Sequence, residues 1–316
     1  MRRAIFRGFV LSVACVLLAP VGSAQAAEAP TGPKTYNVWQ WNVAGDGIHE
    51  GLAVHPDPEA VTMVEQAVGS IVSRGVDLAA FNELCENQYS EIVRQLRDRK
   101  WPVAENISFA RFEPSRPAGN NAICAGNAIG NALFSKKKLG PADRIKLPEP
   151  VGSPSARSLL CAPLDDGSDT VFCTTHITTD TNYKTLQLQA VFKQLVGYGT
   201  PIIAGDFNVQ PHHAKLDAYY SPKVAPDFND GNTGVYRELD DADRNHCVGH
   251  GEPTTDGVEG YNPCGTNSKV DLIFVDENNL TEPASYSADS LAISTACTGV
   301  AACSDHRILT GTVTVK

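Results

Sequence analysis

The chain has 316 residues, of which 42% are hydrophobic and 20% are charged. This is the composition of an ordinary globular protein, and the length suffices for one large sandwich-type domain or two smaller ones. The formal net charge of −10 excludes a whole-body attraction for nucleic acid or anionic membranes. Any polyanionic substrate must therefore be held locally, by a metal ion and a few Arg or Lys side chains.

The N-terminal segment has the parts of a secretory signal peptide, which we place at residues 1–26. It has a basic start (Arg2, Arg3, Arg7), an apolar run (residues 9–18) and a small-residue cleavage site (Ala24-Gln25-Ala26). A membrane anchor is the alternative, but the apolar run is too short to span a bilayer comfortably. Arg2-Arg3 also leaves twin-arginine export open. We expect a secreted protein without a stable membrane anchor.

Cleavage would leave 23 Lys and Arg against 36 Asp and Glu, a net charge of −13. A linker over residues 27–34 and one domain over residues 35–316 would follow, since the chain shows neither internal repeats nor low-complexity segments.

Eight cysteines remain after the signal peptide, and an even number in an exported chain indicates disulfides. Proximity in the sequence favours four pairs: Cys161–Cys173, Cys247–Cys264, Cys297–Cys303 and, by elimination, Cys85–Cys124. A zinc site is the alternative, and the absence of any Cys-x-x-Cys spacing argues against it.

Strands and helices alternate in the first part of the chain, which is typical of a layered α/β fold. We predict strands over 35–43 and 76–84 and helices over 58–74 and 88–99 from their apolar periodicity. Residues 101–127 read as a loop, followed by a strand over 131–135.

The second part contains a predicted hairpin, a helix and three further strands. These are the hairpin strands 157–161 and 170–176, the helix 183–198, and strands over 201–209, 269–275 and 308–315. Residues 221–268 form a long polar stretch, and a loop of that length is usually functional or wrapped over a site.

Polar side chains recur where these strands begin or end. Asp206 and Asn208 follow a buried apolar run and lie two residues apart, so their side chains point to the same side. Glu83 ends another apolar run, where an unpaired carboxylate is costly unless a metal or partner binds it. The full set is Asn42, Glu83, His176, Asp206, Asn208, Asp271, Asp305 and His306.

Several of these residues also have a purely structural interpretation. Asn42 precedes a turn and its amide could cap it. His176 taken alone could be a core histidine with a satisfied hydrogen bond. His212 and His213 are adjacent and cannot share one helix face, so we expect them at the surface or at the rim of the site. As a set, however, two histidines with several carboxylates and amides are the components of metal-assisted phosphoester hydrolysis.

The motifs that contain these residues, in their order along the chain, resemble the endonuclease/exonuclease/phosphatase superfamily, whose best-known branch is deoxyribonuclease-I-like. They are Trp41-Asn42-Val43, Asn82-Glu83-Leu84, Thr175-His176-Ile177, Gly205-Asp206-Phe207-Asn208, the segment 269–275 and Ser304-Asp305-His306-Arg307. The resemblance extends from about residue 36 to residue 315. It implies a four-layer αββα sandwich of two mixed β-sheets flanked by helices, with the site at one edge.

The resemblance also implies roles. Glu83 would hold a divalent cation with Asn42 and Asp305 close by, and oxygen ligands favour Mg²⁺, with Mn²⁺ or Ca²⁺ as alternatives. His306 resembles the general base, and Asp271 would bind its other ring nitrogen. Asp206 and Asn208 would orient water or a phosphate oxygen, while His176 would donate a hydrogen bond to the phosphoryl group.

Two further positions are expected to contact or support the substrate: Arg157, placed like a phosphate-contacting Arg of the family, and Asn131, in a Gly-Asn-Ala motif. The deoxyribonuclease branch also has a Glu that partners the first catalytic histidine, for which Glu113 is the candidate here.

The function expected from these features is a secreted, metal-dependent endonuclease acting on DNA phosphodiesters, as a monomer. A phosphatase or a lipid phosphodiesterase of the sphingomyelinase type is the alternative on the same fold. The latter would be expected to show an exposed aromatic hairpin for membrane insertion, and none is evident. A binding module that has lost catalysis is the third hypothesis, which the complete set of site residues disfavours.

Overall fold

The computed structural model describes residues 32–119, 123–224, 231–243, 248–257, 264–265, 267–282 and 285–316. The predicted signal peptide and most of the predicted linker lie outside these ranges, as does Cys247 of the predicted Cys247–Cys264 pair.

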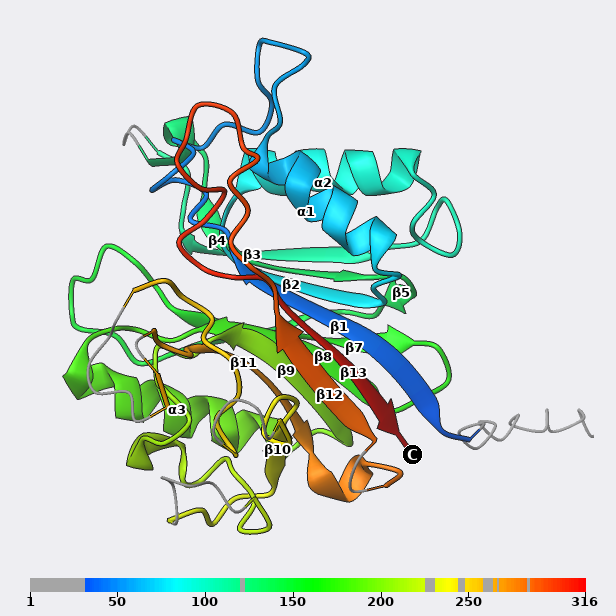
Figure 1. The fold of residues 1–316 in the computed structure, drawn as a ribbon, viewed down its shortest axis with the longest axis vertical. Coiled ribbons are helices and arrows are strands. Elements are labelled where there is room, and N and C mark those ends of the chain that lie inside the picture. Colours follow the sequence, from blue (N-terminus) through cyan, green and yellow to red (C-terminus); the bar gives the residue numbers. More distant parts are fainter. Residues whose placement is uncertain are drawn as a thin grey trace, which may run out of the picture.

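Two mixed β-sheets form the centre of the described part of the chain (Figure 1). The first has the order β12-β13-β1-β2-β4-β3, from β12 (Tyr286–Ser290), β13 (Leu309–Val315), β1 (Lys34–Asn42), β2 (Leu78–Cys85), β4 (Ile129–Ser135) and β3 (Ala110–Arg116). The second has the order β10-β11-β9-β8-β7-β5, from β10 (Tyr236–Glu238), β11 (Asp271–Asp276), β9 (Thr200–Asp206), β8 (Thr170–His176), β7 (Ser158–Asp165) and β5 (Lys138–Leu139), and β6 (Asp143–Lys146) also pairs with β7.

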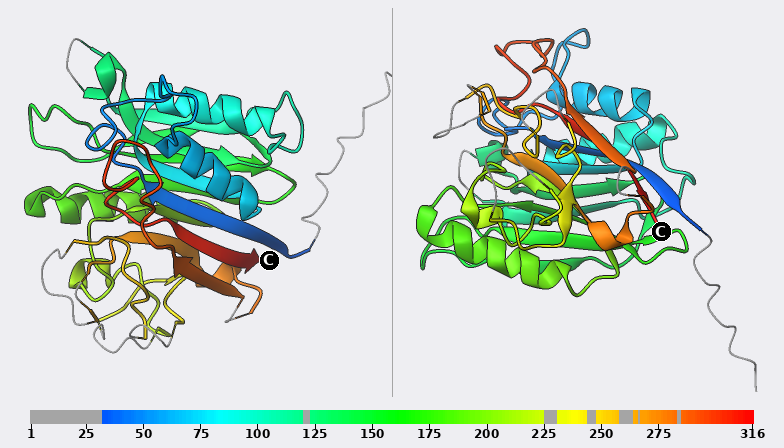
Figure 2. Two further views of the ribbon diagram at one scale, coloured as in Figure 1. Left: turned by 45° about the horizontal axis from the view of Figure 1, so that its top comes forward. Right: turned by 60° about the horizontal axis from the view of Figure 1, so that its bottom comes forward.

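Helices cover the two outer faces of this sandwich. Figures 1 and 2 show α1 (Met63–Ser73) and α2 (Glu86–Asp98) over the first sheet and α3 (Thr181–Leu195) over the second. Three apolar clusters fill the spaces between the four layers: one between the sheets, one beneath α1 and α2, and one beneath α3. The predicted four-layer αββα fold is confirmed.

The first helix begins later than predicted. Thr62 is its N-cap and forms a capping box with Glu65, in which each side chain accepts a hydrogen bond from the backbone N–H of the other residue. The predicted start at residue 58 is wrong, because the N-cap at Thr62 makes Met63 the first residue of the helix.

The expectation of a loop throughout residues 101–127 is also wrong, because β3 (Ala110–Arg116) lies within it. This strand contains Pro114 and stands at the edge of the first sheet, the position in which a strand tolerates proline. Its side chains are mostly half-buried, so that it lacks the apolar alternation that indicates a strand. Strand β10 within the polar stretch 221–268, and β12 after it, carried no clear sequence signal either.

Three of the predicted disulfides are present: Cys85–Cys124, Cys161–Cys173 and Cys297–Cys303. Cys161 and Cys173 face each other across the antiparallel strands β7 and β8. The other two pairs lie next to predicted site residues, since Cys85 follows Glu83 by two positions and Cys303 precedes His306 by three.

The strand order explains how distant segments meet. Strand β13 pairs antiparallel with β1, so that the residues just before β13 lie beside the end of β1. In the second sheet, Asp206 at the end of β9 is aligned with Asp271 at the start of β11 and with His176 at the end of β8. The first strand, the last strand and the centre of the second sheet therefore contribute to one edge of the sandwich.

Candidate active site

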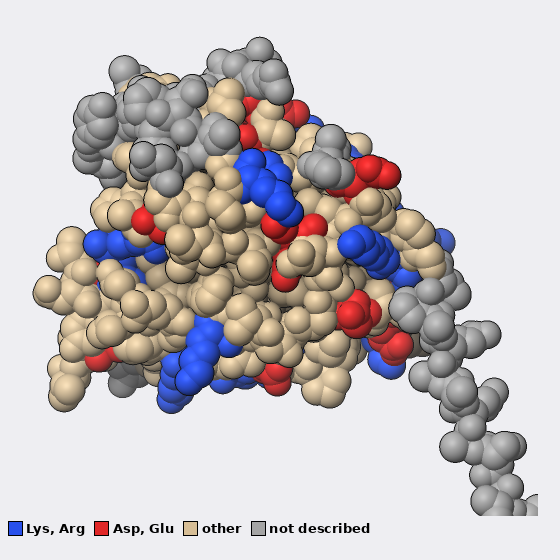
Figure 3. Space-filling model, turned by 90° about the horizontal axis from the view of Figure 1, so that it is seen from below, with Lys and Arg blue, Asp and Glu red and all other residues tan. Residues whose placement is uncertain are grey.

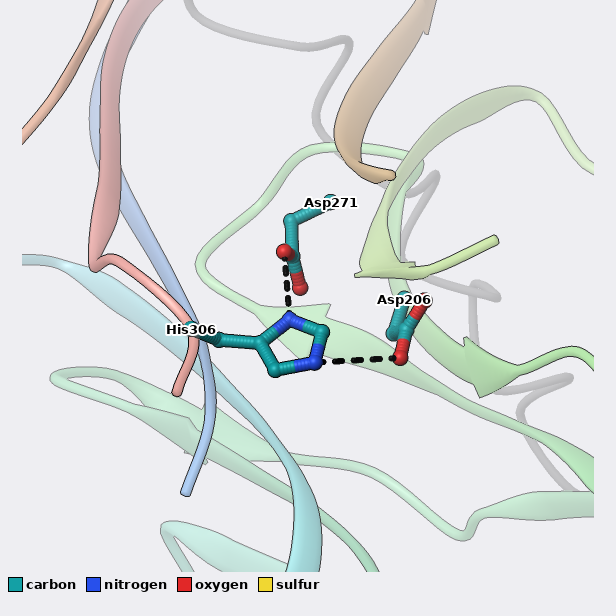
Figure 4. A group of neighbouring side chains, drawn as sticks. All are labelled: Asp206, Asp271 and His306. Carbon is teal, nitrogen blue, oxygen red and sulfur yellow. Dashed lines mark hydrogen bonds and ion pairs between the residues drawn. The ribbon is translucent and has the colours of Figure 1, made fainter. Parts of the chain in front are cut away.

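His306 and Asp271 form a hydrogen-bonded pair at this edge (Figure 4). The imidazole Nδ1 lies 2.8 Å from Oδ2 of Asp271, whose side chain has no exposed surface. Burial by itself would lower the pKa of His306, but the adjacent Asp271 carboxylate, with smaller contributions from two other aspartates, raises the pKa to about 10. The pair fixes the ring orientation and leaves Nε2 facing the remaining site residues.

Backbone contacts hold both members of this pair in place. The hydroxyl of Thr254 accepts hydrogen bonds from the N–H groups of Val270 and Asp271, each at 3.0 Å. On the other side, the Ser304 hydroxyl accepts from the N–H of His306 at 3.0 Å and donates to the carbonyl of Asn42 at 2.7 Å. Thr254 and Ser304 were absent from the predicted site, although Ser304 lies within one of the motifs that identified it.

Asp206 faces the free nitrogen of His306 (Figure 4). Its Oδ2 lies 3.9 Å from Nε2 of His306, which is longer than a direct hydrogen bond, and 3.4 Å from Nε2 of His176. Burial is the main reason that the pKa of Asp206 is raised to about 7. Asp206 is 1% exposed and has two imidazoles beside it. Burying a carboxylate costs free energy of folding, and the packing of the apolar core does not require one at this position.

Asn42 joins the carboxylates of the two sheets. Its Nδ2 donates to Oδ2 of Asp206 at 3.1 Å and to Oε1 of Glu83 at 3.2 Å. Its Oδ1 accepts from the N–H of Ala44 at 3.2 Å, so that the turn-capping interpretation and the site interpretation both hold.

Glu83 reaches the site through an irregularity in its strand. The pairing of β2 with β4 shifts register between Phe81 and Leu84, and Glu83 has a φ of +54°. A left-handed conformation is unfavourable for a residue with a side chain, and such strain concentrates at functional sites. The carboxylate is 37% exposed and its Oε1 lies 3.8 Å from Nε2 of His176.

His176 is buried beside Asp206 and Glu83. Burial, and then the positive charges of Arg157 and His306, lower its pKa well below 6.5. The imidazole is therefore neutral at physiological pH, and a neutral ring can still donate one hydrogen bond to a phosphoryl oxygen.

Asn208 lies close to Asp206, and its backbone N–H and its side-chain amide both form hydrogen bonds within the protein. Its N–H donates to Oδ1 of Asp206 at 2.9 Å, its Nδ2 donates to the carbonyl of Ile177 at 2.9 Å, and its φ is +50°. Lys184 of α3, which the sequence analysis did not select, donates to the carbonyl of Asn208 at 2.6 Å. These contacts position the loop after β9.

The other predicted residues lie at different depths. Arg157 is half-buried near His176, and its guanidinium makes no hydrogen bond or ion pair with the residues that the structure describes. Asp305 is exposed, and its Oδ1 lies 3.5 Å from the Ser304 hydroxyl. Asn131 is 2% exposed and its amide bonds to Asn82 and to the carbonyl of Ser158, so that it lies beneath the site.

Glu113 is not the partner of a catalytic histidine. Its carboxylate forms an ion pair with Arg144 at 2.8 Å, on the edge strand β3. Glu113, the candidate for this role, therefore does not fill it. His212 and His213 match the expectation in part: His213 is exposed, whereas His212 is half-buried and stacks on His250 with ring centroids 5.6 Å apart.

The donor set fits a hard divalent cation. Ligand atoms of Asp206, Asp271 and His306 lie within 4.8 Å of one another, and Glu83 adds a partly exposed carboxylate close by. The Oδ1 atom of Asp271 is buried and has no hydrogen-bond partner. The carboxylate oxygens suit Mg²⁺, Mn²⁺ or Ca²⁺, whereas the His306 imidazole, bonded to Asp271 through Nδ1, keeps Nε2 available to accept a proton. When bound, such an ion would polarise a phosphoryl oxygen and offset its negative charge.

This arrangement, a four-layer sandwich with a His–Asp pair and a carboxylate and amide cluster at one edge, has the groups that a phosphoesterase site requires. The sequence profile of the endonuclease/exonuclease/phosphatase family matches residues 39–306, and the chain belongs to this family. Its members are phosphoric ester hydrolases that depend on divalent metal ions. No curated protein sequence matches this chain.

Solved structures share the fold at low sequence identity. An endonuclease/exonuclease/phosphatase protein from Beutenbergia cavernae is 18% identical, with a TM-score of 0.55 over 89% of this chain and 71% of that one. The human Nocturnin catalytic domain with a bound sulfate anion is 15% identical, with a TM-score of 0.60 over 89% and 94% of the two chains. Zebrafish (D. rerio) TDP2 complexed with a single-strand DNA product is 16% identical, with a TM-score of 0.55 over 89% and 99%.

Proposed function

We propose that the protein is a secreted, metal-dependent endonuclease that hydrolyses DNA phosphodiesters. The observation that carries the proposal is the His306–Asp271 pair, with Nε2 of His306 directed towards the Asp206, Asn42 and Glu83 cluster. A water molecule between Nε2 and a phosphate held at that cluster would be placed for in-line attack.

Four side chains of the site have defined roles in the proposed reaction. His306 accepts the proton of the attacking water through Nε2, while Asp271 holds the ring and stabilises the imidazolium that forms. The neighbouring carboxylates raise the pKa of His306 to about 10, and a bound cation that neutralised them would lower it. Neutral His176 donates to the phosphoryl oxygen, and Arg157 adds positive charge beside it.

The charge of the protein disfavours binding of a nucleic acid along an extended surface, since the net charge is −10. On the face shown in Figure 3, Lys and Arg side chains of the described residues occur in small groups, separated by Asp, Glu and uncharged residues. That face offers no continuous basic track for a nucleic-acid strand. Binding would depend on contacts at single phosphates, which position the strand independently of sequence.

The surface disfavours a lipid substrate. The large hydrophobic side chains exposed among the described residues are Leu52, Val54, Val103, Val151, Leu186 and Val196. None is aromatic, so the described residues offer no aromatic hairpin that would insert into a membrane. A search of the described residues also finds no helix of the length and hydropathy needed to cross a bilayer.

The test is cleavage of supercoiled plasmid DNA by the mature protein with Mg²⁺. We expect nicking that EDTA abolishes and that His306→Ala lowers by about 10²- to 10⁴-fold, the usual contribution of a general base. His55→Ala is the matched control, since that histidine lies in the loop before α1, and it should nick normally. Cleavage of sphingomyelin vesicles or phosphomonoesters without nicking of DNA would overturn the nuclease assignment and favour the other branches of the family.

Secretion has its own support and test. The three disulfides among the described residues are typical of a protein that folds in an oxidising compartment. Mass spectrometry of the protein exported by its host should show a mature chain that lacks residues 1–26. An intact N-terminus on a protein retained in the cytoplasm would contradict the proposal.

A further inference from the structure

The amide of Asn82 lies fully buried between the two sheets, directly beneath the site. Its Oδ1 accepts hydrogen bonds from the backbone N–H of Asp206 at 2.8 Å and from Nε2 of Gln40 at 3.0 Å. Its Nδ2 donates to Oδ1 of Asn131 at 2.9 Å and to the carbonyl of Thr175 at 3.1 Å. One side chain thus connects β1, β2 and β4 of the first sheet with β8 and β9 of the second.

Asn82 stands where the apolar layer between the sheets ends. Leu78 and Ala80, on the same face of β2, belong to the cluster that fills the space between the sheets, and Asn82 is the next residue on that face. Apolar contacts are not directional and allow two packed sheets to shift relative to each other. A buried network of hydrogen bonds permits one arrangement only, because any shift leaves polar groups unpaired.

The two residues that this network joins are the carboxylates of the site. Glu83 follows Asn82 in the chain, and Asp206 binds it through its backbone N–H. Glu83 belongs to the first sheet and Asp206 to the second, so their separation depends on how the sheets are held together at this end. Asn42, which bonds to both carboxylates, depends on the same separation.

We propose that Asn82 is a positioning residue: by locking the two sheets together, its amide sets the separation of Glu83 and Asp206 that metal binding and catalysis require. This rests on the proposed phosphodiesterase function. Asn82 itself touches neither substrate nor reacting atoms, and it acts through the two carboxylates.

The experiment compares Asn82→Ser with a variant that loses a different hydrogen bond between the two sheets, at the far end of the sandwich. Tyr36 of β1 is 4% exposed and donates from the inner face of the first sheet to Oδ2 of Asp166, in the turn between β7 and β8 of the second, at 2.9 Å. Tyr36→Phe therefore also removes a hydrogen bond between the sheets, remote from the site. Activity is measured on plasmid DNA and on bis(4-nitrophenyl) phosphate, and Mn²⁺ binding by electron paramagnetic resonance in the absence of substrate.

We expect Asn82→Ser to lower kcat by about 100-fold with little change in KM, as for misplacement of catalytic groups by about 1 Å. Mn²⁺ binding should weaken in parallel, and Asn82→Gln, which keeps the amide, should recover part of both. Tyr36→Phe should keep wild-type kcat and Mn²⁺ affinity. If Asn82→Ser does not fold, Gln40→Leu, which removes one of the two donors to the Asn82 carbonyl, should give a smaller loss of kcat and Mn²⁺ affinity.

Wild-type kcat and Mn²⁺ affinity in folded Asn82→Ser or Gln40→Leu would overturn the proposal, as would equal losses in Tyr36→Phe. The readouts also separate it from the nuclease assignment. A wild-type protein that cleaves bis(4-nitrophenyl) phosphate but not DNA refutes the nuclease function, whereas the effect of Asn82→Ser on Mn²⁺ binding still decides the positioning role.

Discussion

Nδ1 of His306 lies 2.8 Å from Oδ2 of Asp271, a carboxylate without exposed surface at the start of β11. The carboxylate stabilises the protonated imidazole and selects the tautomer that leaves Nε2 free to accept a proton. Asp271→Asn keeps the shape of the side chain but removes its charge. We expect kcat to fall by about 10²- to 10⁴-fold and the pKa of His306 to fall from about 10, since the imidazolium loses its counter-charge.

Steady-state kinetics and an NMR titration of the histidines would check both effects. Asp276→Asn, at the other end of the same strand, is the control and should retain activity. An Asp271→Asn enzyme with unchanged kcat would show that the pair is structural.

Glu83 is the partly exposed carboxylate of the cluster, and its strained backbone directs it towards the site. Glu83→Gln removes a negative charge that a hard cation needs, so the Mg²⁺ concentration for half-maximal activity should rise at least about tenfold, as for loss of one metal ligand or its support. Glu86→Gln is the matched control, because Glu86 is exposed in the first turn of α2. Identical Mg²⁺ dependence of both variants would remove Glu83 from the metal site.

The disulfides should differ in what they contribute. Cys161–Cys173 joins two adjacent strands and closes a loop with a sequence separation of 12. Replacing both cysteines by Ala should lower the free energy of unfolding by about 3 kcal/mol, from the chain entropy of a loop of that size, while the folded enzyme keeps its kcat. Urea unfolding monitored by tryptophan fluorescence would measure the loss. The corresponding change at Cys85–Cys124, two residues from Glu83, should instead weaken Mg²⁺-dependent activity in the folded protein.

His250 should make the protein sensitive to acid. It is 3% exposed, and burial, followed by the positive charge of Lys269, lowers its pKa from 6.5 to about 4. Between these values the unfolded chain binds more protons than the folded one. The contribution of His250 to stability is therefore complete above pH 6.5 and is lost as the pH falls towards 4.

Comparison with His250→Asn isolates this effect. Between pH 7 and pH 4.5 the wild type should lose about 2 kcal/mol more in free energy of unfolding than the variant, as expected for a pKa shift of this size. Buried Glu238, whose pKa is raised to about 7 mainly by burial, acts in the opposite direction in both proteins and cancels from the difference. Parallel pH profiles would show that His250 does not stay neutral.

The site motifs could be predicted because each lies where a short apolar segment begins or ends. Asp206, Glu83 and His176 stand out as polar residues that end buried strands, and the strand ends meet at one edge of the sandwich. The short disulfides followed from proximity alone. The fold class followed from the alternation of elements together with the order of the motifs.

The remaining features depend on contacts between distant residues, which produce no recognisable pattern in the local sequence. Asn82 next to Glu83 looks like any polar residue at a strand end, and its role depends on atoms of β8 and β9 about a hundred residues away. The half-buried pattern of β3 gives no alternation to detect. The candidate Glu113 has no local pattern that reveals its partner, which is Arg144.

Strand β13 lies between β12 and β1, and among the described residues it is the last strand and β1 is the first. A chain that stops before residue 304 would leave one edge of β1 unpaired and would lack His306 beside Asn42. We therefore expect such a truncated chain to be inactive and to expose a strand edge that is open to pairing with other chains.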